Sequence, residues 1–216
     1  MGNFVFDLDG TLVDSALDLH ACSNRFLKQI DLPPLGLETV TGFIGNGVGK
    51  LVERVLRESG VYQQGTELDA SIGQYIEIYA AAPAKFCKAY PGVMTTLASL
   101  KADGHQLGIC TNKTESLARL VVKAVGLDKY CTALIGGDTL PVRKPNPKPI
   151  FECARQLGDI GFIYVGDSET DAFAAEHGRI PFLLHTQGYR KRPAEHLYHS
   201  ALFSNWHEFR STVEGL

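Results

Sequence analysis

Short apolar runs and helical stretches alternate along most of this chain. The first run, residues 4–8, is rich in strand-forming residues and predicts a buried parallel strand. From residue 90 onward, the pattern predicts strands at 106–110, 133–135, 162–165 and 180–184, separated by helices at 93–102, 115–125, 149–157 and 170–176. A short apolar run at 201–203 and a final helix at 206–213 complete the predicted elements. Strands that alternate with helices indicate an α/β fold with a doubly wound parallel sheet.

Residues 15–84 depart from this alternation, because they contain no convincing strand. One helix is expected after Asp14 or Ser15, a second between the glycine-rich loop 42–50 and Gly60, and a third at 67–82. An all-helical block inside an α/β chain indicates an inserted domain. We therefore expect an α/β core formed by residues 1–14 and 85–216, with a helical domain formed by residues 15–84.

Composition narrows the class of protein. The chain has 216 residues, of which 44% are hydrophobic, so a packed core is expected. A net charge of −3 argues against nucleic acid as a partner and supplies no basic patch for a membrane. The longest uncharged run is too short for a membrane span, and we expect no signal peptide. Five cysteines without a Cys-x-x-Cys pair are typical of reduced thiols in a cytoplasmic protein.

Two carboxylates, Asp7 and Asp9, stand at the end of the first strand and are followed by Gly10. In open α/β sheets, ligands bind outside the carboxyl ends of the strands. Neighbouring acids repel each other and resist desolvation unless a cation or a proton relieves them. The alternative is a solvated turn, in which Asp and Gly are ordinary residues.

Three later segments place more polar groups at or near the same sheet edge. Thr111 and Asn112 follow the strand at 106–110, and Lys144 follows the strand at 133–135 at some distance. Asp167 and Asp171 follow the strand at 162–165. Each of these residues also has a purely structural interpretation. Thr111 and Asn112 could form a turn and a helix cap, and Asp171 could be an acid that stabilises the first turn of a helix. Lys144 could be a solvated loop lysine, in which case Arg143 is the alternative cation. Their joint placement favours a catalytic site.

These four segments resemble, in order, the four motifs of the haloacid dehalogenase superfamily, and the helical block lies where that superfamily inserts its helical cap. The matching segments are residues 7–12, 111–112, 144–145 and 166–171. Further segments resemble the phosphoglycolate phosphatases within the superfamily, namely residues 13–15, 42–47, 90–93, 111–113 and 136–138.

The resemblance implies a role for each core residue. Asp7 would attack phosphorus and form an aspartyl-phosphate, while Asp9 would protonate the leaving alkoxide and later deprotonate water. Mg²⁺ would be bound by Asp7, the backbone carbonyl of Asp9 and Asp167, with Asp171 ligating it directly or through water. The phosphoryl oxygens would be held by Thr111, Asn112 and Lys144.

Substrate choice is expected to come from the cap, where the loop 42–50 is the most distinctive stretch. Its glycines would let backbone amides approach a ligand, and helix N-termini attract anions. The candidate residues are Gly45, Asn46, Gly47 and Lys50. The alternative is a hinge in which Lys50 is simply solvated.

The resulting prediction is a Mg²⁺-dependent phosphatase of a small phosphorylated metabolite, foremost 2-phosphoglycolate, acting as a monomer or homodimer without nucleic acid or membrane partners. A dehalogenase is disfavoured because Asp9 has no use when halide leaves without a proton. A sugar phosphomutase of the same superfamily and a non-enzymatic phospho-switch similar to a receiver domain remain the alternatives.

Overall fold

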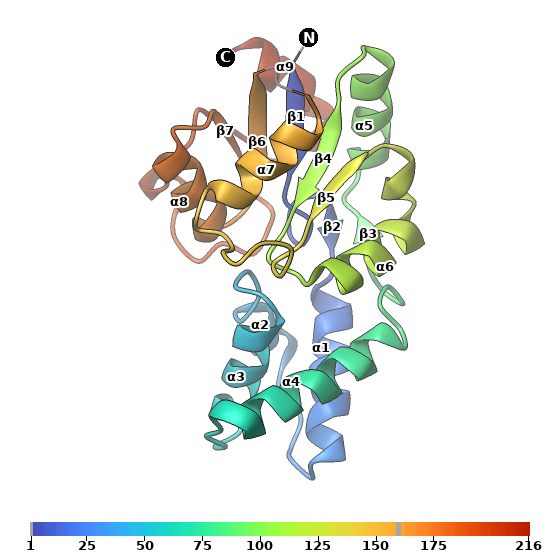
Figure 1. Cartoon of the computed structure of the whole chain (residues 1–216), viewed down its shortest axis with the longest axis vertical. Coiled ribbons are helices and arrows are strands. Elements are labelled where there is room, and N and C mark those ends of the chain that lie inside the picture. The colour runs from blue at the N-terminus through green and yellow to red at the C-terminus, as the bar shows by residue number, and fades with distance from the viewer. Residues whose placement is uncertain (1, 159–160) are drawn as a thin grey trace.

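A six-stranded parallel sheet forms the centre of the larger part of the molecule (Figure 1). The computed structural model describes residues 2–158 and 161–216. The strand order is β5-β4-β1-β6-β7-β8, and every neighbouring pair is parallel. The strands are β1 (Asn3–Phe6), β4 (Leu107–Cys110), β5 (Ala133–Ile135), β6 (Phe162–Gly166), β7 (Phe182–His185) and β8 (Ala201–Phe203). The predicted doubly wound sheet is confirmed, with β1 near its middle.

Helices cover both faces of the sheet, which explains why the strands read as continuous apolar runs. Phe4 and Phe6 of β1 belong to the core shared with α5, α6 and α9, whereas Val5 belongs to the core shared with α7 and α8. These helices are α5 (Val93–Ala102), α6 (Glu115–Val125), α7 (Lys148–Gln156), α8 (Glu169–Gly178) and α9 (Phe209–Glu214). Short 3-10 turns occur at η1 (Leu127–Lys129), η2 (Ala194–His196) and η3 (Trp206–Glu208). Residues 206–213, predicted as one helix, therefore form η3 followed by α9.

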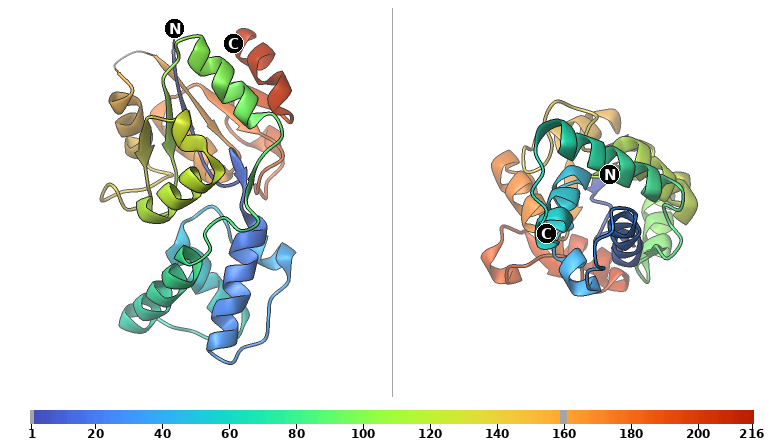
Figure 2. Two further views of the ribbon diagram at one scale, coloured as in Figure 1. Left: turned by 90° about the vertical axis from the view of Figure 1, so that its right-hand side faces the viewer. Right: turned by 90° about the horizontal axis from the view of Figure 1, so that it is seen from below.

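Four helices form a separate layer beyond the carboxyl edge of the sheet, at one end of the long axis (Figures 1 and 2). They are α1 (Ala16–Gln29), α2 (Leu37–Thr41), α3 (Val48–Glu58) and α4 (Gly65–Ala80), and we call them the helical block. Buried side chains such as Phe26, Leu56 and Tyr75 form the interior of the block. Among the described residues, no helix is long and apolar enough to cross a membrane.

A two-stranded antiparallel ladder lies where the chain enters and leaves the helical block. Its strands are β2 (Val13–Asp14) and β3 (Lys88–Ala89), and neither these strands nor the five-residue α2 was predicted. Elements this short fall below the length at which a periodic pattern can be recognised. The ladder adjoins the predicted boundaries at 14/15 and 84/85, and we propose that it marks the junction between core and cap.

Candidate active site

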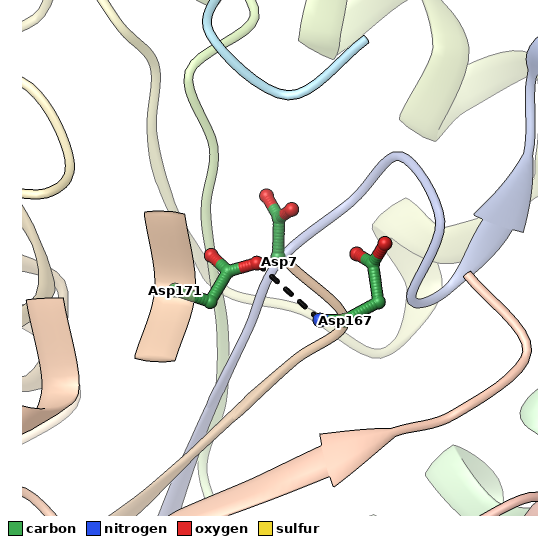
Figure 3. Close-up of side chains that lie close together, drawn as sticks. All are labelled: Asp7, Asp167 and Asp171. Atoms are coloured by element: carbon green, nitrogen blue, oxygen red, sulfur yellow. Dashed lines mark hydrogen bonds between the residues drawn. The ribbon is translucent and has the colours of Figure 1, made fainter. Parts of the chain in front are cut away.

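Three buried carboxylates gather at the carboxyl edge of the sheet (Figure 3). Asp7 follows β1, Asp167 follows β6, and Asp171 lies in the first turn of α8. One oxygen of each lies within 4.8 Å of the others. The adjacent parallel pairing of β1 with β6 brings the first two together, because the carboxyl ends of parallel strands share one edge.

Close backbone approach fixes Asp167 in this group. Gly10 has a φ of +88°, and a Cβ at this position would lie 2.4 Å from Asp167 Oδ2. The Asp167 carboxylate accepts hydrogen bonds from Thr11 Oγ1 at 2.9 Å and from the Tyr189 backbone N–H at 2.7 Å. The glycine after the two N-terminal acids is therefore required by the packing of the site as well as by the turn.

Asp171 is fully occupied by partners within the protein. Its Oδ1 accepts from Lys144 Nζ and from the Tyr164 hydroxyl, both at 2.6 Å. Its Oδ2 accepts from the Ser168 hydroxyl at 2.7 Å and from the Ser168 and Asp167 backbone N–H groups at 3.1 and 3.3 Å. Burial alone would raise the pKa of Asp171, but Lys144 and these hydrogen bonds hold it below its usual value. This environment favours a supporting role over direct metal ligation.

Lys144 is the buried counter-ion of the group. Besides Asp171, its Nζ lies 2.8 Å from Asp7 Oδ1 and donates to the Tyr164 hydroxyl at 2.8 Å. Burial would lower the pKa of Lys144, but Asp171 and Asp7 outweigh it and raise the pKa. The lysine therefore stays charged between two carboxylates.

Burial nevertheless dominates at the other two acids. It raises the pKa of Asp7 to about 7, with Lys144 opposing the rise and the neighbouring Asp171 and Asp9 adding to it. Burial, together with the like charges of Asp171 and Asp7, raises the pKa of Asp167 well above its usual value. The negative charges of ionised Asp7 and Asp167 are therefore the least compensated by the surrounding protein.

Asp9 has a different set of partners, which the sequence did not reveal. Its Oδ1 accepts from the Ser15 hydroxyl at 2.5 Å, and Lys113 Nζ donates to both carboxylate oxygens at 2.8 and 3.0 Å. Ser15 is itself held by Tyr189, whose hydroxyl accepts from the Ser15 backbone N–H at 2.8 Å. The sequence signals for Lys113 were its position directly after Thr111 and Asn112 and its place in the segment 111–113, one of those on which the family resemblance rests.

Thr111 and Asn112 are buried beside Asp7, as expected from their strand. The Asn112 side-chain amide donates to the backbone oxygens of Gly45 at 3.1 Å and Lys144 at 3.0 Å. It thus ties the loop of the helical block to the lysine segment of the core. We expect the backbone N–H of Asn112, and not its occupied side chain, to contact phosphate.

A cavity of about 50 Å³ lies between these core residues and the helical block. Gly45 and Gly47 line it, and a Cβ on Gly47 would lie 2.8 Å from the Asn112 carbonyl oxygen. The other residues that line it are Asp7, Asp9, Leu19, Ile44, Val48, Leu51, Tyr75, Tyr79, Thr111, Asn112, Lys113 and Leu117.

Two of the candidate specificity residues lie outside this cavity. Asn46 instead donates to Thr170 Oγ1 at 3.1 Å and accepts from Arg54 at 2.7 Å. Lys50 is half-exposed, and its Nζ pairs with Glu53 at 2.6 Å. The helical turn that carries Lys50 directs its ammonium to Glu53 at i+3, and the role of Lys50 in substrate choice stays a prediction.

The site suits a divalent cation bound by oxygen. The carboxylates of Asp7, Asp9, Asp167 and Asp171 face the two ammonium groups of Lys113 and Lys144. Ionisation of all four acids would leave two negative charges uncompensated. Asp7 Oδ1 is buried and accepts no hydrogen bond of good geometry from the described residues. Carboxylate oxygens are the ligands that Mg²⁺ prefers.

Comparison with known proteins places this site in context. The family model described as haloacid dehalogenase-like hydrolase matches residues 4–184. The chain is 42% identical to a phosphoglycolate phosphatase of Cereibacter sphaeroides, over 100% of this chain and 99% of that protein. It is 39% identical to a phosphoglycolate phosphatase of Rhodobacter capsulatus, over 98% and 96%. A crystal structure of a predicted phosphoglycolate phosphatase from Haemophilus somnus superposes with a TM-score of 0.90 at 29% identity, covering 99% and 98%.

Proposed function

The chain belongs to the haloacid dehalogenase-like hydrolase family, and from this premise we propose that it hydrolyses 2-phosphoglycolate to glycolate and phosphate. It is a phosphoric monoester hydrolase, as its full-length relatives are. The substrate is proposed from the names of those relatives. The observation that carries the proposal is the buried Asp7, held between Lys144 and the Asp9–Lys113 pair at the end of β1.

We propose that Asp7 is the nucleophile. A carboxylate oxygen of Asp7 forms a bond to phosphorus as the bond between phosphorus and the ester oxygen breaks. The Asp9 carboxyl group gives its proton to the departing ester oxygen. Asp9 then takes a proton from a water molecule, which attacks the aspartyl-phosphate and releases phosphate. This sequence restores both side chains to their starting states.

Asp7, Asp167 and the backbone carbonyl of Asp9 would hold Mg²⁺. When bound, the cation neutralises the charge that otherwise keeps a phosphate dianion away from these carboxylates. Asp171 would not ligate the cation directly, because its oxygens already accept hydrogen bonds within the protein. Its role would be to orient Lys144. Lys144, Thr111 and the Asn112 backbone would hold the phosphoryl oxygens as charge spreads over them.

The test is phosphate release from a panel of phosphorylated metabolites in the presence of Mg²⁺. We expect sustained turnover, with 2-phosphoglycolate giving the highest kcat/KM. A sugar 1-phosphate should release phosphate slowly and yield no 6-phosphate isomer. A higher kcat/KM for another monoester would replace the proposed substrate. A single stoichiometric phosphorylation of the protein would instead favour a phospho-switch.

A further inference from the structure

Lys113 is the one cation among the described residues that line the cavity between the sheet edge and the helical block. Its side chain is 6% exposed. The ammonium lies 4.8 Å from the centre of the Tyr79 ring, which comes from α4 in the helical block. Lys113 therefore joins a core residue, Asp9, to the apolar wall of the cavity.

The ammonium has donor capacity beyond its contact with Asp9. A lysine carries three N–H donors, and two of them are directed to the Asp9 oxygens. Tyr79 also lines the cavity, and its buried hydroxyl has no hydrogen-bond partner among the described residues. A buried hydroxyl without a partner is costly, so a polar ligand group at this place would be stabilised.

Three other cations near the site are already engaged elsewhere. Lys144 lies between Asp7 and Asp171, at the end of the site assigned to the phosphoryl group. Arg54 donates to the Phe43 carbonyl at 2.9 Å and to Asn46, and so holds the loop. Lys50 is paired with Glu53 outside the cavity.

We propose that Lys113 determines specificity by binding a carboxylate carried one carbon away from the phosphoester oxygen, with the Tyr79 hydroxyl as a second donor. The proposal rests on the proposed function and assigns the residue that reads this substrate class. Asp9 serves the ester oxygen, so a cation 2.8 Å from Asp9 is within reach of a carboxylate one methylene away. An uncharged tail would leave both donors unmatched among apolar side chains.

The size of the cavity supports a short substrate. Its volume of about 50 Å³ corresponds to roughly four water molecules at ~10–15 Å³ each. A two-carbon chain with a terminal carboxylate suits this space better than a sugar ring does. Leu19, Leu51 and Tyr75 exclude water around it, which strengthens an ion pair to Lys113.

The test compares 2-phosphoglycolate with ethyl phosphate, a two-carbon monoester without a carboxylate. Lys113→Met removes the ammonium, and Lys113→Gln removes the charge while keeping a donor for Asp9. We expect both variants to lower the ratio of kcat/KM for phosphoglycolate to that for ethyl phosphate by about 10- to 100-fold, as for a lost charged hydrogen bond. Lys123→Met, an exposed lysine on α6, should leave the ratio unchanged.

Each outcome separates this proposal from the proposed function. If both variants reduce the two substrates by the same factor, Lys113 acts only on Asp9 and the proposal is overturned. A phosphoglycolate-selective loss in Lys50→Met, absent from the Lys113 variants, would also overturn it. If the wild-type protein shows no preference for phosphoglycolate over ethyl phosphate, the proposed substrate itself is wrong. Thermal melts identify a misfolded Lys113→Met, in which case Lys113→Gln decides.

Discussion

Replacing the nucleophile should make the metal-free protein more stable. In Asp7→Asn the buried carboxylate becomes a neutral amide of the same shape. The pKa of Asp7 is raised from 3.8 to about 7 in the folded protein. Between these values the unfolded chain has released a proton that the folded protein keeps. The free energy of unfolding therefore falls as pH rises from about 4 to about 7, and the loss is complete above that.

The magnitude follows from the size of the pKa shift. A shift of about three pH units corresponds to about 4 kcal/mol of destabilisation above pH 7, as an upper bound. The raised pKa already includes the attraction between Asp7 and Lys144, which opposes the rise, so no separate cost is subtracted for the loss of this partner. We expect a gain of up to about 4 kcal/mol at pH 8, or roughly 8–16 °C in Tm for a chain of this length.

Thermal melts in EDTA at pH 8 and pH 5 measure this difference. Asp69→Asn, an exposed acid on α4, is the control and should shift neither melt. The gain should shrink at pH 5, where wild-type Asp7 is protonated. A variant that is less stable than the wild-type protein at pH 8, or a gain equal at both pH values, would refute the idea that Asp7 is an uncompensated buried acid. Turnover should be lost in either case, because an amide does not attack phosphorus.

Two further predictions concern the metal and the turn. Asp167→Ala should abolish both phosphatase activity and the rise in Tm that Mg²⁺ gives the wild-type protein; full wild-type activity in EDTA, or equal activity with Ca²⁺, would contradict the metal assignment. Gly10→Ala should lower Tm and activity much more than Gly60→Ala, since both glycines have a positive φ but only Gly10 lies against Asp167. Both effects are measured by thermal melting and phosphate release. If the two substitutions have equal effects, the loss in Gly10→Ala comes from the positive φ alone and not from contact with Asp167.

The core of the site could be predicted from sequence because one topological rule places it. Parallel strands end at a common edge, so Asp7, Thr111 and Asp167 were expected at one edge once their strands were recognised, and the strand order β4-β1-β6 makes them neighbours. The fold followed from the same alternation. The role of Asp171 was harder to predict. An acid in the first turn of a helix gives the same sequence pattern whether it caps the helix, binds metal or orients a lysine. The structure shows that Asp171 takes part in a helix cap and binds Lys144, while its part in metal binding stays a prediction.

The remaining features depend on contacts that no local pattern contains. Lys113 looks in sequence like a solvated lysine before a helix, and its pairing with Asp9 joins residues 104 positions apart. The surface position of Lys50, by contrast, could be read from the helical pattern. Leu51 and Val55 define the buried stripe of α3, and Lys50 has an acid three residues later on the helix surface. The ladder of β2 and β3 has two residues per strand, too few for any periodicity.

Hydrogen bonds link the loop of the helical block to the core segments that carry Lys144 and Asp171. Asn112 binds both the Gly45 carbonyl of the loop and the Lys144 carbonyl, while Asn46 reaches Thr170 beside Asp171. Asp7 lines the cavity together with Gly45 and Gly47, so its burial belongs to the arrangement in which the loop is docked. Burial is what raises the pKa of Asp7, so docking without a cation is costly, and a bound cation offsets that cost. By linkage, whatever favours the docked loop must tighten cation binding, and the cation must favour docking by the same free energy.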